Sequence, residues 1–482
     1  MYLGIDLGTS SVKAMLVDET FATVAVAHAG LTVQRPHPGW SEQAPADWIT
    51  ATESALDQLR ASHGEALARL QGIGLSGHMH GGTLLDASDA VLRPCILWND
   101  GRSGAQCDTL TGRADFHGIA GNLVMAGFTA PKLLWVAENE PEVFEKTAKV
   151  LLPKDYLRLW LTGEHVSEMS DAAGTLWLDT GKRDWSDTLL EATGFTRSQM
   201  PALVEGSDVS GRLRRELAER WGVPQVPVAG GAGDNAATAC GMGVMRPGTG
   251  FLSLGTSGVL FAASDQYQPN TGDAVHTFCH AVPETWHQMG VILSATDSMT
   301  WLSEITGREV PELAGLVPER PEAPARVGFL PYLSGERTPL NDPDAAGAFV
   351  GLRRDVALPE MVQAVMEGVA FAFADCVRVL RKAGTEVEAA YAVGGGARSR
   401  AWLEIMAAAT GLRLLVPAEG DFGAAFGAAK LAAAAATGAT GPEVFAQPEV
   451  GAEIAPDAKL ADLYAKKYEA YMRGYPATRD LA

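Results

Sequence analysis

One short turn occurs twice in this chain, and the repeat constrains the fold more than any other feature of the sequence. The first copy, at residues 6–12, reads Asp-Leu-Gly-Thr-Ser-Ser-Val, and the second, at residues 253–259, reads Ser-Leu-Gly-Thr-Ser-Gly-Val. In each copy an apolar strand enters the turn and a second apolar run leaves it, which predicts a β-hairpin. Gly-Thr-Ser alone is ordinary hairpin chemistry, but a repeated segment near the starts of two halves indicates duplicated domains.

The repeated turn also has the chemistry of a phosphate site. Glycine lets the main chain approach a ligand closely, and successive N–H groups with Thr and Ser hydroxyls form a concave surface suited to phosphate oxygens. Two such turns, one from each half, would hold a polyphosphate from both sides. The repeat therefore predicts two domains with a ligand-binding cleft between them.

Size and composition agree with this prediction. The chain has 482 residues, more than one hydrophobic core usually supports. Hydrophobic residues make up 47% and charged residues 20%, as in ordinary globular proteins, and no apolar run approaches the ~18 residues of a membrane helix. The N-terminus lacks the features of a signal peptide. We therefore expect a cytoplasmic protein without a membrane partner.

Charge and cysteine content exclude further classes of function. The formal net charge of −20 repels nucleic acid, so bound phosphate must be held locally by amides, single basic residues or a metal. The five cysteines are scattered and include no Cys-x-x-Cys pair, which argues against a disulfide framework and a zinc site. Nucleic acid is not an expected partner, whereas a small phosphate ligand is.

Strand-like and helix-like segments alternate along the chain, which predicts the α/β class. We expect the charged residues 198–225 to be largely helical and the alanine-rich residues 423–437 to form a helix beside a sheet. Another helix is expected near residues 459–475. The sequence leaves open whether it packs on the first or the second half.

A glycine-rich turn at residues 230–233 follows a short apolar strand and places Asp234 before an alanine-rich helix. Two interpretations remain open from the residues alone. The carboxylate of Asp234 could cap the helix, because Asp is preferred at that position. It could instead be a general base, which must face a substrate hydroxyl.

Other segments are candidates for ligand binding. Residues 394–396 are three glycines at a strand-to-helix turn, which leaves room for a flat ligand, although a plain turn explains them equally well. Neither Gly-x-Gly-x-x-Gly nor a P-loop is present. His78 and His80 lack a third metal ligand at a characteristic spacing, and we expect a polar loop at the edge of the cleft. Trp98 ends another strand, where a surface turn is the simple alternative.

Together these segments resemble the FGGY family of carbohydrate kinases, within the actin-like, ribonuclease-H-like ATPases. The resemblance extends from residue 1 to about residue 437, and its motifs lie at residues 127–139, 332–339, 347–367 and 394–399. It implies an α/β, two-domain actin-like ATPase fold with a central cleft. Residues 1–245 would bind the sugar and carry the catalytic base, and residues 246–482 would bind the nucleotide. The implied enzyme is a carbohydrate kinase that uses ATP and Mg²⁺.

Four stretches resemble the members of the family that phosphorylate D-xylulose to D-xylulose 5-phosphate, at residues 35–43, 77–81, 96–102 and 152–156. Glycerol kinases carry an Arg-Glu pair where this chain has Met79 and His80, which disfavours glycerol. His78 departs from the pattern, in which Gln is expected. Another ketose or polyol as substrate and a non-catalytic actin-like ATP switch are the alternatives, and the enzyme could form a homodimer.

The resemblance also implies roles for individual residues. Asp234 would accept the proton of the attacking sugar hydroxyl, and Asp6 would face the magnesium ion. The sugar would contact Met79, His80, Trp98, Asp234 and Asn235. The nucleotide would be held by Thr9, Ser10, Lys13, Gly255, Thr256 and Ser257 at its phosphates and by Gly394, Gly395 and Gly396 at its adenosine.

Overall fold

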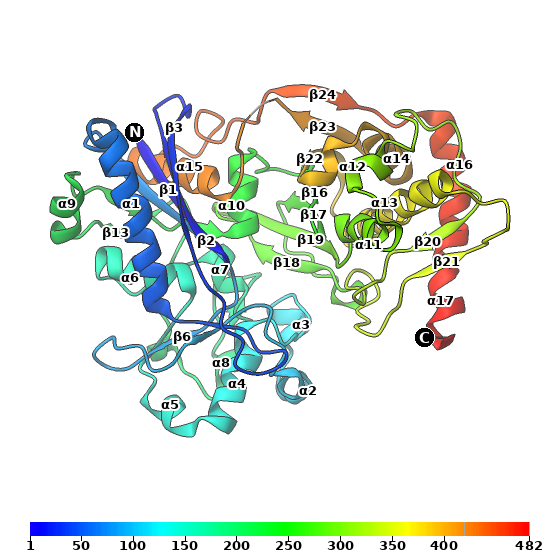
Figure 1. The fold of residues 1–482 in the computed structure, drawn as a ribbon. Coiled ribbons are helices and arrows are strands. Elements are labelled where there is room, and N and C mark those ends of the chain that lie inside the picture. The colour runs from blue at the N-terminus through cyan, green and yellow to red at the C-terminus, as the bar shows by residue number, and fades with distance from the viewer. Residues whose placement is uncertain (419, 482) are drawn as a thin grey trace. The chain divides into compact units, whose positions relative to one another are not determined.

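The computed structural model describes residues 1–418 and 420–481, which form two compact units (Figure 1). Unit 1 comprises Met1–Met245, Phe278–Trp286 and Asp421–Gln447, and unit 2 comprises Arg246–Thr277, His287–Gly420 and Pro448–Ala482. Ala482, the last residue of the expected second domain, lies outside the described residues. The chain thus leaves unit 1 after residue 245, and two later segments belong to that unit again.

A mixed seven-stranded sheet forms the centre of unit 1. Its order is β13 (Val209–Arg212), β14 (Pro227–Ala229), β5 (Gly72–Gly77), β1 (Tyr2–Leu7), β2 (Ser11–Val17) and β3 (Thr23–Gly30), and β15 (Ala232–Gly233) also pairs with β5. β1 and β2 are antiparallel and form the expected hairpin. β5 is the parallel neighbour of β1 on its other side.

The sheet of unit 2 repeats this arrangement. Its order is β18 (His276–Cys279), β19 (Trp286–Ile292), β17 (Gly258–Ser264), β16 (Gly248–Leu254), β22 (Val387–Val393), β23 (Arg413–Pro417) and β24 (Val450–Ile454). β16 is antiparallel to β17 and parallel to β22. The two copies of the Gly-Thr-Ser turn therefore occupy equivalent places in two sheets of like topology, as the sequence repeat predicts.

The alanine-rich segment forms α15 (Ala424–Thr437), which packs on β1 and β5 of unit 1 (Figure 1). Glycines on the strands allow the helix backbone to come very close. A Cβ atom at Gly4 would lie 1.8 Å from the carbonyl oxygen of Ala425, and one at Gly74 would lie 1.9 Å from that of Ala428. Small residues on both surfaces are thus the reason that this helix can lie on the sheet.

The sequence leaves open which half the C-terminal helix packs on, and the structure places it in unit 2. α16 (Ala458–Met472), the predicted C-terminal helix, belongs to unit 2 and packs against α13 (Leu358–Lys382) and α14 (Arg400–Thr410). Tyr464 and Tyr471 of α16 are buried in the hydrophobic core of that unit. Among the described residues, no helix has the length and apolar character required to cross a membrane.

The expectation of a largely helical segment at residues 198–225 is wrong. Only α9 (Arg215–Trp221) is an α-helix there, whereas β12 (Ala202–Val204) and β13 are strands. β12 pairs with β9 (Val166–Glu168), and β13 pairs with β14. These partners lie elsewhere in the sequence, so tertiary pairing overrides the local helical preference of the charged residues.

Candidate active site

Two carboxylates lie near each other at one edge of the unit 1 sheet. Asp6 is close to the end of β1, and Asp234 is the first residue of α10 (Asp234–Gly241), directly after β15. β1 and β15 both pair with β5, where Ser76 is opposite Asp6 on one side and opposite Ala232 on the other. The negative charge of Asp6 contributes to the raised pKa of Asp234, so the two side chains interact.

The surroundings of Asp234 suit a proton acceptor. Burial and, second, the charge of Asp6 raise its pKa to about 6, while hydrogen bonds from Asn235 oppose the rise. The backbone N–H and the side-chain amide of Asn235 donate to Asp234 Oδ1 at 2.7 and 3.0 Å. A base with a pKa near the working pH is mostly ionised yet still accepts a proton readily.

The alternative in which Asp234 caps the helix is wrong. The N-cap residue of α10 is Gly233, and Asp234 already has a place in the first turn of the helix. Gly233 is still paired with β5, so the helix begins one residue later than a capping aspartate would require. Asp234 is therefore not the N-cap residue, although its carboxylate accepts the backbone N–H of Asn235 in the first turn.

Asp6 has the character of a ligand for a hard cation. Burial raises the pKa of Asp6, and the negative charge of Asp421 raises it further. The nearby Ser76 hydroxyl and the Lys13 ammonium group lower it. Ser76 does not reach Asp6 with the geometry of a hydrogen bond, and within the described residues Asp6 Oδ1 is buried without such a bond. Lys13, opposite Asp6 on β2, is itself ion-paired with Asp421.

A magnesium ion fits this environment only together with a phosphate ligand. Mg²⁺ commonly binds one or two protein carboxylates and takes its other ligands from water and substrate phosphates. No group of three or more His, Cys, Asp or Glu side chains that could hold a metal occurs in the part of the chain that is described. The buried oxygen of Asp6 thus suits the first mode of binding rather than an all-protein site.

The first Gly-Thr-Ser turn is held by two side chains from other motifs. Gln43 Nε2 donates to the carbonyl oxygen of Thr9 at 2.7 Å, and Trp98 Nε1 donates to Thr9 Oγ1 at 3.0 Å. Trp98 is 48% exposed, and Ser10 is exposed at the tip of the turn. Sequence reasoning did not single out Gln43, although it belongs to one of the four stretches that characterise this chain.

Met79 and His80 lie beside the loop that carries Asp234. A Cβ atom at Gly233 would be 3.0 Å from Met79 Sδ, and one at Gly174 would be 2.8 Å from Met79 Cε. His80 Nδ1 lies 2.7 Å from the carbonyl oxygen of Gly174. Because a carbonyl only accepts, Nδ1 carries the proton of this hydrogen bond.

The backbone of His80 is strained and is held by α4 (Thr129–Asn139). Its φ of 73° lies in the left-handed region, which residues other than glycine rarely adopt. Thr129 Oγ1 and Lys132 Nζ donate to its carbonyl oxygen at 3.0 and 3.2 Å, and the Phe128 ring lies 4.4 Å from its imidazole. The motif at residues 127–139 therefore supports the His80 loop.

His78, the residue that departs from the family pattern, packs in the core. Its ring meets the buried Trp48 edge to face at 5.7 Å. Burial and, second, the charge of Lys132 lower its pKa to about 3, so the ring is neutral. Neither ring nitrogen has a hydrogen bond to a described residue.

In unit 2 the second Gly-Thr-Ser turn lies against the triple glycine. Gly394 has a φ of 92°, and a Cβ atom there would be 2.5 Å from the carbonyl oxygen of Leu254 and 3.1 Å from Gly255 N. The N–H and hydroxyl of Thr296, the first residue of α11 (Thr296–Thr306), donate to the carbonyl oxygen of Gly255 at 2.9 and 2.8 Å. Thr256 is exposed in the same turn, as is Ser257.

A pocket of about 770 Å³ opens beside these glycines, which is large enough for a nucleotide. Gly395 and Gly396 line it, and most of its other lining residues were not predicted. They come from α11, from α12 (Val310–Ala314) and the loop after it, from α13 and from the turn and first residues of α14, and only those within the motifs at residues 347–367 and 394–399 have a sequence signal. They include Met299, Val310, Pro311, Val317, Arg398 and Trp402.

Models of the two domains of one enzyme family match most of the chain. The N-terminal domain of the FGGY family of carbohydrate kinases matches residues 1–241, and its C-terminal domain matches residues 250–436. This chain belongs to the FGGY family. The family resemblance seen in the sequence is thereby confirmed, and the protein is a carbohydrate kinase, for which ATP is the expected phosphoryl donor.

Individual FGGY kinases are similar to the chain along its whole length. It is 48% identical over 478 residues to xylulose kinase of Escherichia coli strain K12, which covers 98% of each chain. It is 51% identical over 434 residues to xylulose kinase of Klebsiella pneumoniae, which covers 90% of this chain and 89% of the relative. A crystal structure of a xyloylose kinase from Brucella ovis matches all of both chains with 55% identity and a TM-score of 0.98. The predicted α/β, two-domain kinase fold is confirmed.

Proposed function

We propose that this FGGY kinase transfers the γ-phosphoryl group of ATP to D-xylulose and releases D-xylulose 5-phosphate and ADP. Relatives named xylulose kinase, at 48% and 51% identity over most of the chain, support this choice of sugar. The observation that carries the proposal is the half-buried carboxylate of Asp234, with a pKa of about 6, next to a loop that presents Met79 and His80. A non-catalytic switch would have no use for such a base.

Asp234 would act as the general base. Its carboxylate takes the proton of the attacking sugar hydroxyl while that oxygen forms a bond to the γ-phosphorus. The bond from this phosphorus to the β–γ bridging oxygen breaks, and its electron pair leaves with ADP. Asn235 holds the carboxylate in place through its two donated hydrogen bonds. Positioning and charge stabilisation supply most of the catalysis in such reactions.

The sugar would be held by groups on unit 1. Met79 offers an apolar contact beside Asp234, and the imidazole of His80 would form a hydrogen bond with a sugar hydroxyl. Asn235 and the exposed ring of Trp98 complete the proposed set. The hydrogen bond of Trp98 to Thr9 would couple the sugar contacts to the first phosphate turn.

ATP would be held by the two Gly-Thr-Ser turns and the triple glycine. Thr9 and Ser10, with Gly255, Thr256 and Ser257, would donate to phosphate oxygens. The pocket beside Gly394, Gly395 and Gly396 has the volume for the adenosine. Lys13 would have a lesser part, because Asp421 already pairs with its ammonium group. Magnesium, when bound at Asp6, would offset the negative charge of the phosphate oxygens.

The proposed activity is tested by measuring ADP release with a panel of ketoses and polyols. We expect D-xylulose to give the highest rate above the sugar-independent background. If no sugar raises ADP release above that background, the kinase proposal fails for every sugar tested. If another sugar exceeds D-xylulose, the proposed substrate is wrong.

The proposed base is tested by Asp234→Ala, which should abolish sugar-dependent ADP release and leave ATP binding measurable. Asp187→Ala is a matched control, because Asp187 is also the first residue of a helix in unit 1, α8 (Asp187–Ala192), but is exposed. Retained turnover in Asp234→Ala would remove the residue from this role.

The cytoplasmic location and the homodimer are further parts of the proposal. Cell fractionation tests the first, and light scattering of the purified protein tests the second.

A further inference from the structure

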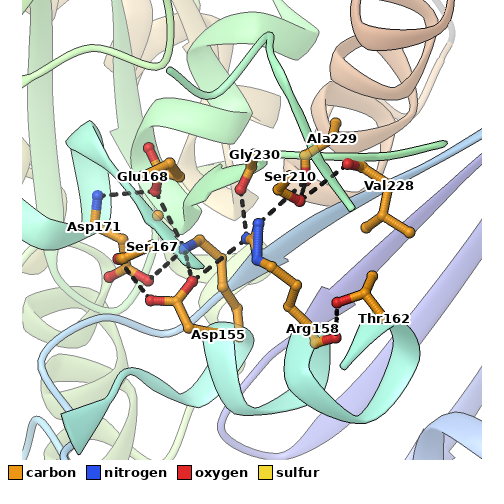
Figure 2. Close-up of polar contacts among 12 residues, drawn as sticks. Asp155, Arg158, Thr162, Ser167, Glu168, Asp171, Ser210, Val228, Ala229 and Gly230 are labelled. Atoms are coloured by element: carbon orange, nitrogen blue, oxygen red, sulfur yellow. Dashed lines mark hydrogen bonds and ion pairs between the residues drawn. The ribbon is translucent and has the colours of Figure 1, made fainter. Parts of the chain in front are cut away.

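Five charged side chains are completely buried in unit 1, and one of them contacts Gly230 at the start of the loop that leads to Asp234 (Figure 2). Three come from α6 (Pro153–Thr162), and the others come from β9 and from α7 (Met169–Ala173). They are Lys154, Asp155, Arg158, Glu168 and Asp171. Taking charges out of water is costly unless they are paired, so a cluster of this kind is rarely needed for packing alone. Two of its members belong to the stretch at residues 152–156, for which the proposed reaction supplies no role.

The charges pair with one another around Lys154. Its Nζ lies 2.7 Å from Asp155 Oδ1, 3.1 Å from Asp171 Oδ2 and 3.3 Å from Glu168 Oε1. Burial raises the pKa of Asp171 to about 8, against the charge of Lys154. Because these partners come from α6, β9 and α7, the cluster fixes three elements of unit 1 relative to one another.

Arg158, one of the five buried charges, contacts the start of the loop. Arg158 Nη2 donates to the carbonyl oxygen of Gly230 at 2.5 Å, and Nη1 donates to that of Ala229 at 3.3 Å (Figure 2). Asp155 Oδ1 lies 3.4 Å from Nη2 and steadies the guanidinium group. The planar fork of an arginine suits this double contact, which the single ammonium group of lysine does not reproduce.

Ser170, which is hydrogen-bonded to Glu168 of the cluster, contacts the end of the loop. Ser170 Oγ accepts a hydrogen bond from the backbone N–H of Gly233 at 3.1 Å, immediately before Asp234. The same hydroxyl donates to Glu168 Oε2 at 2.8 Å, which turns its lone pairs toward Gly233. Glu168 also accepts from the backbone N–H groups of Ser170 and Asp171 at 2.7 and 2.9 Å.

The loop between these two contacts is held by its backbone and by external groups, since it is mostly glycine. The N–H groups of Gly230 and Gly231 donate to the carbonyl oxygens of Asp208 and Gly206 at 2.8 and 2.9 Å. Gly230, Gly231 and Gly233 have no side chains, and Gly231 has a φ of 77°. Glycine loses more conformational freedom on ordering than any other residue, so external contacts must hold such a segment. The carboxylate that follows must nevertheless be placed closely, because a misplacement of about 1 Å can lower turnover by about 10²-fold.

We propose that Arg158 and Ser170 are positioning residues for catalysis, held by the buried charges so that they fix both ends of the 229–233 loop and thereby the carboxylate of Asp234. The inference rests on the proposed role of Asp234 as the base. It assigns the stretch at residues 152–156 to the placement of the base rather than to contact with the sugar.

Two serines that contact the cluster provide a matched test. Ser167 and Ser170 are both buried, and each hydroxyl donates to a carboxylate of the cluster, Ser167 to Asp155 Oδ2 at 2.7 Å and Ser170 to Glu168. Only Ser170 also accepts from the loop. Ser170→Ala should lower the sugar-dependent kcat by about tenfold or more and leave the KM for ATP within about twofold of wild type. Ser167→Ala should keep kcat within about twofold while losing a similar amount of thermal stability.

Equal kcat values in the two serine variants would overturn the inference. If Ser170→Ala does not fold, Arg158→Lys takes its place, since it keeps the positive charge beside Asp155 but loses the double contact to the loop. It should lower kcat with an unchanged KM for ATP, and wild-type kcat in that variant would also refute the inference. Loss of turnover in Asp234→Ala together with wild-type kcat in these variants would refute only the positioning role, whereas full activity of Asp234→Ala would refute the proposed base itself.

Discussion

The pKa of Asp234 predicts how sugar phosphorylation depends on pH. Burial and the charge of Asp6 raise this pKa to about 6, which is roughly two units above the usual value and corresponds to about 3 kcal/mol against ionisation. Only the ionised carboxylate accepts a proton, so activity should fall as the pH drops through this value. At pH 5 about a tenth of the protein would have an ionised Asp234, and kcat/KM for the sugar should be about a tenth of its value at pH 7.5.

The assay is the initial rate of ADP release between pH 5 and pH 8, with sugar below its KM and ATP saturating. Circular dichroism at each pH separates loss of ionisation from loss of fold. Asp234→Asn should lower kcat/KM by about 10² to 10⁴ and abolish the acidic limb. Burial also raises the pKa of Asp6, so any limb that persists in Asp234→Asn reports on Asp6. A wild-type kcat/KM that is constant from pH 5 to pH 7.5 would refute the reasoning.

Three further predictions concern stability and the phosphate turn. Burial raises the pKa of Glu336 from its usual 4.5 to about 8, so the folded protein loses stability as the pH rises from about 4.5 to about 8, where only the unfolded state has released this proton. Glu336→Gln should therefore be more stable than wild type by about 4 kcal/mol at pH 8 and lose most of this advantage at pH 5, as measured by urea unfolding. A Cβ atom at Gly427 would lie 1.7 Å from the carbonyl oxygen of Ala237, so Gly427→Ala should lower the free energy of unfolding by about 3 kcal/mol or more. Gly112, also in a helix, has open space around it, so Gly112→Ala should leave the free energy of unfolding unchanged or raise it in the same experiment. Trp98→Phe removes the hydrogen bond to Thr9 and should raise the KM for ATP several-fold without a change in melting temperature; an unchanged KM would show that this bond does not support the turn.

The elements that position the site were predictable to different degrees. The two Gly-Thr-Ser hairpins and the helix of α15 follow from local patterns, because turn glycines and alanine runs favour those structures with few neighbours. The strands at β12 and β13 do not, since pairing with β9 and with β14, outside their own segments, overrides the local helical preference. The pocket in unit 2 was recognised only at its glycine turn, because most of its remaining lining comes from separate helices and from a loop that are distant in the sequence.

Asp234 illustrates the difference between what its local sequence predicts and what its tertiary surroundings add. Its sequence context, a glycine turn before a helix, allowed both a cap and a base, and local chemistry could not decide between them. The structure excludes Asp234 as the N-cap residue, because β15 stays paired with β5 through Gly233 and the helix starts at Asp234. The proposal that it is the base draws support from burial and, second, from the charge of Asp6 on β1, which together raise its pKa to about 6.

The sequence by itself determined the family, the duplication and the residues that could carry the chemistry, because motifs of this length are specific and turns are encoded locally. Only the tertiary structure decided which of those residues interact. Burial, the proximity of charges and long-range hydrogen bonds set the pKa of Asp234, turned His78 into the core and tied the loop before Asp234 to Arg158 and Ser170. These effects depend on distances between residues remote in the chain, and no local pattern records such distances.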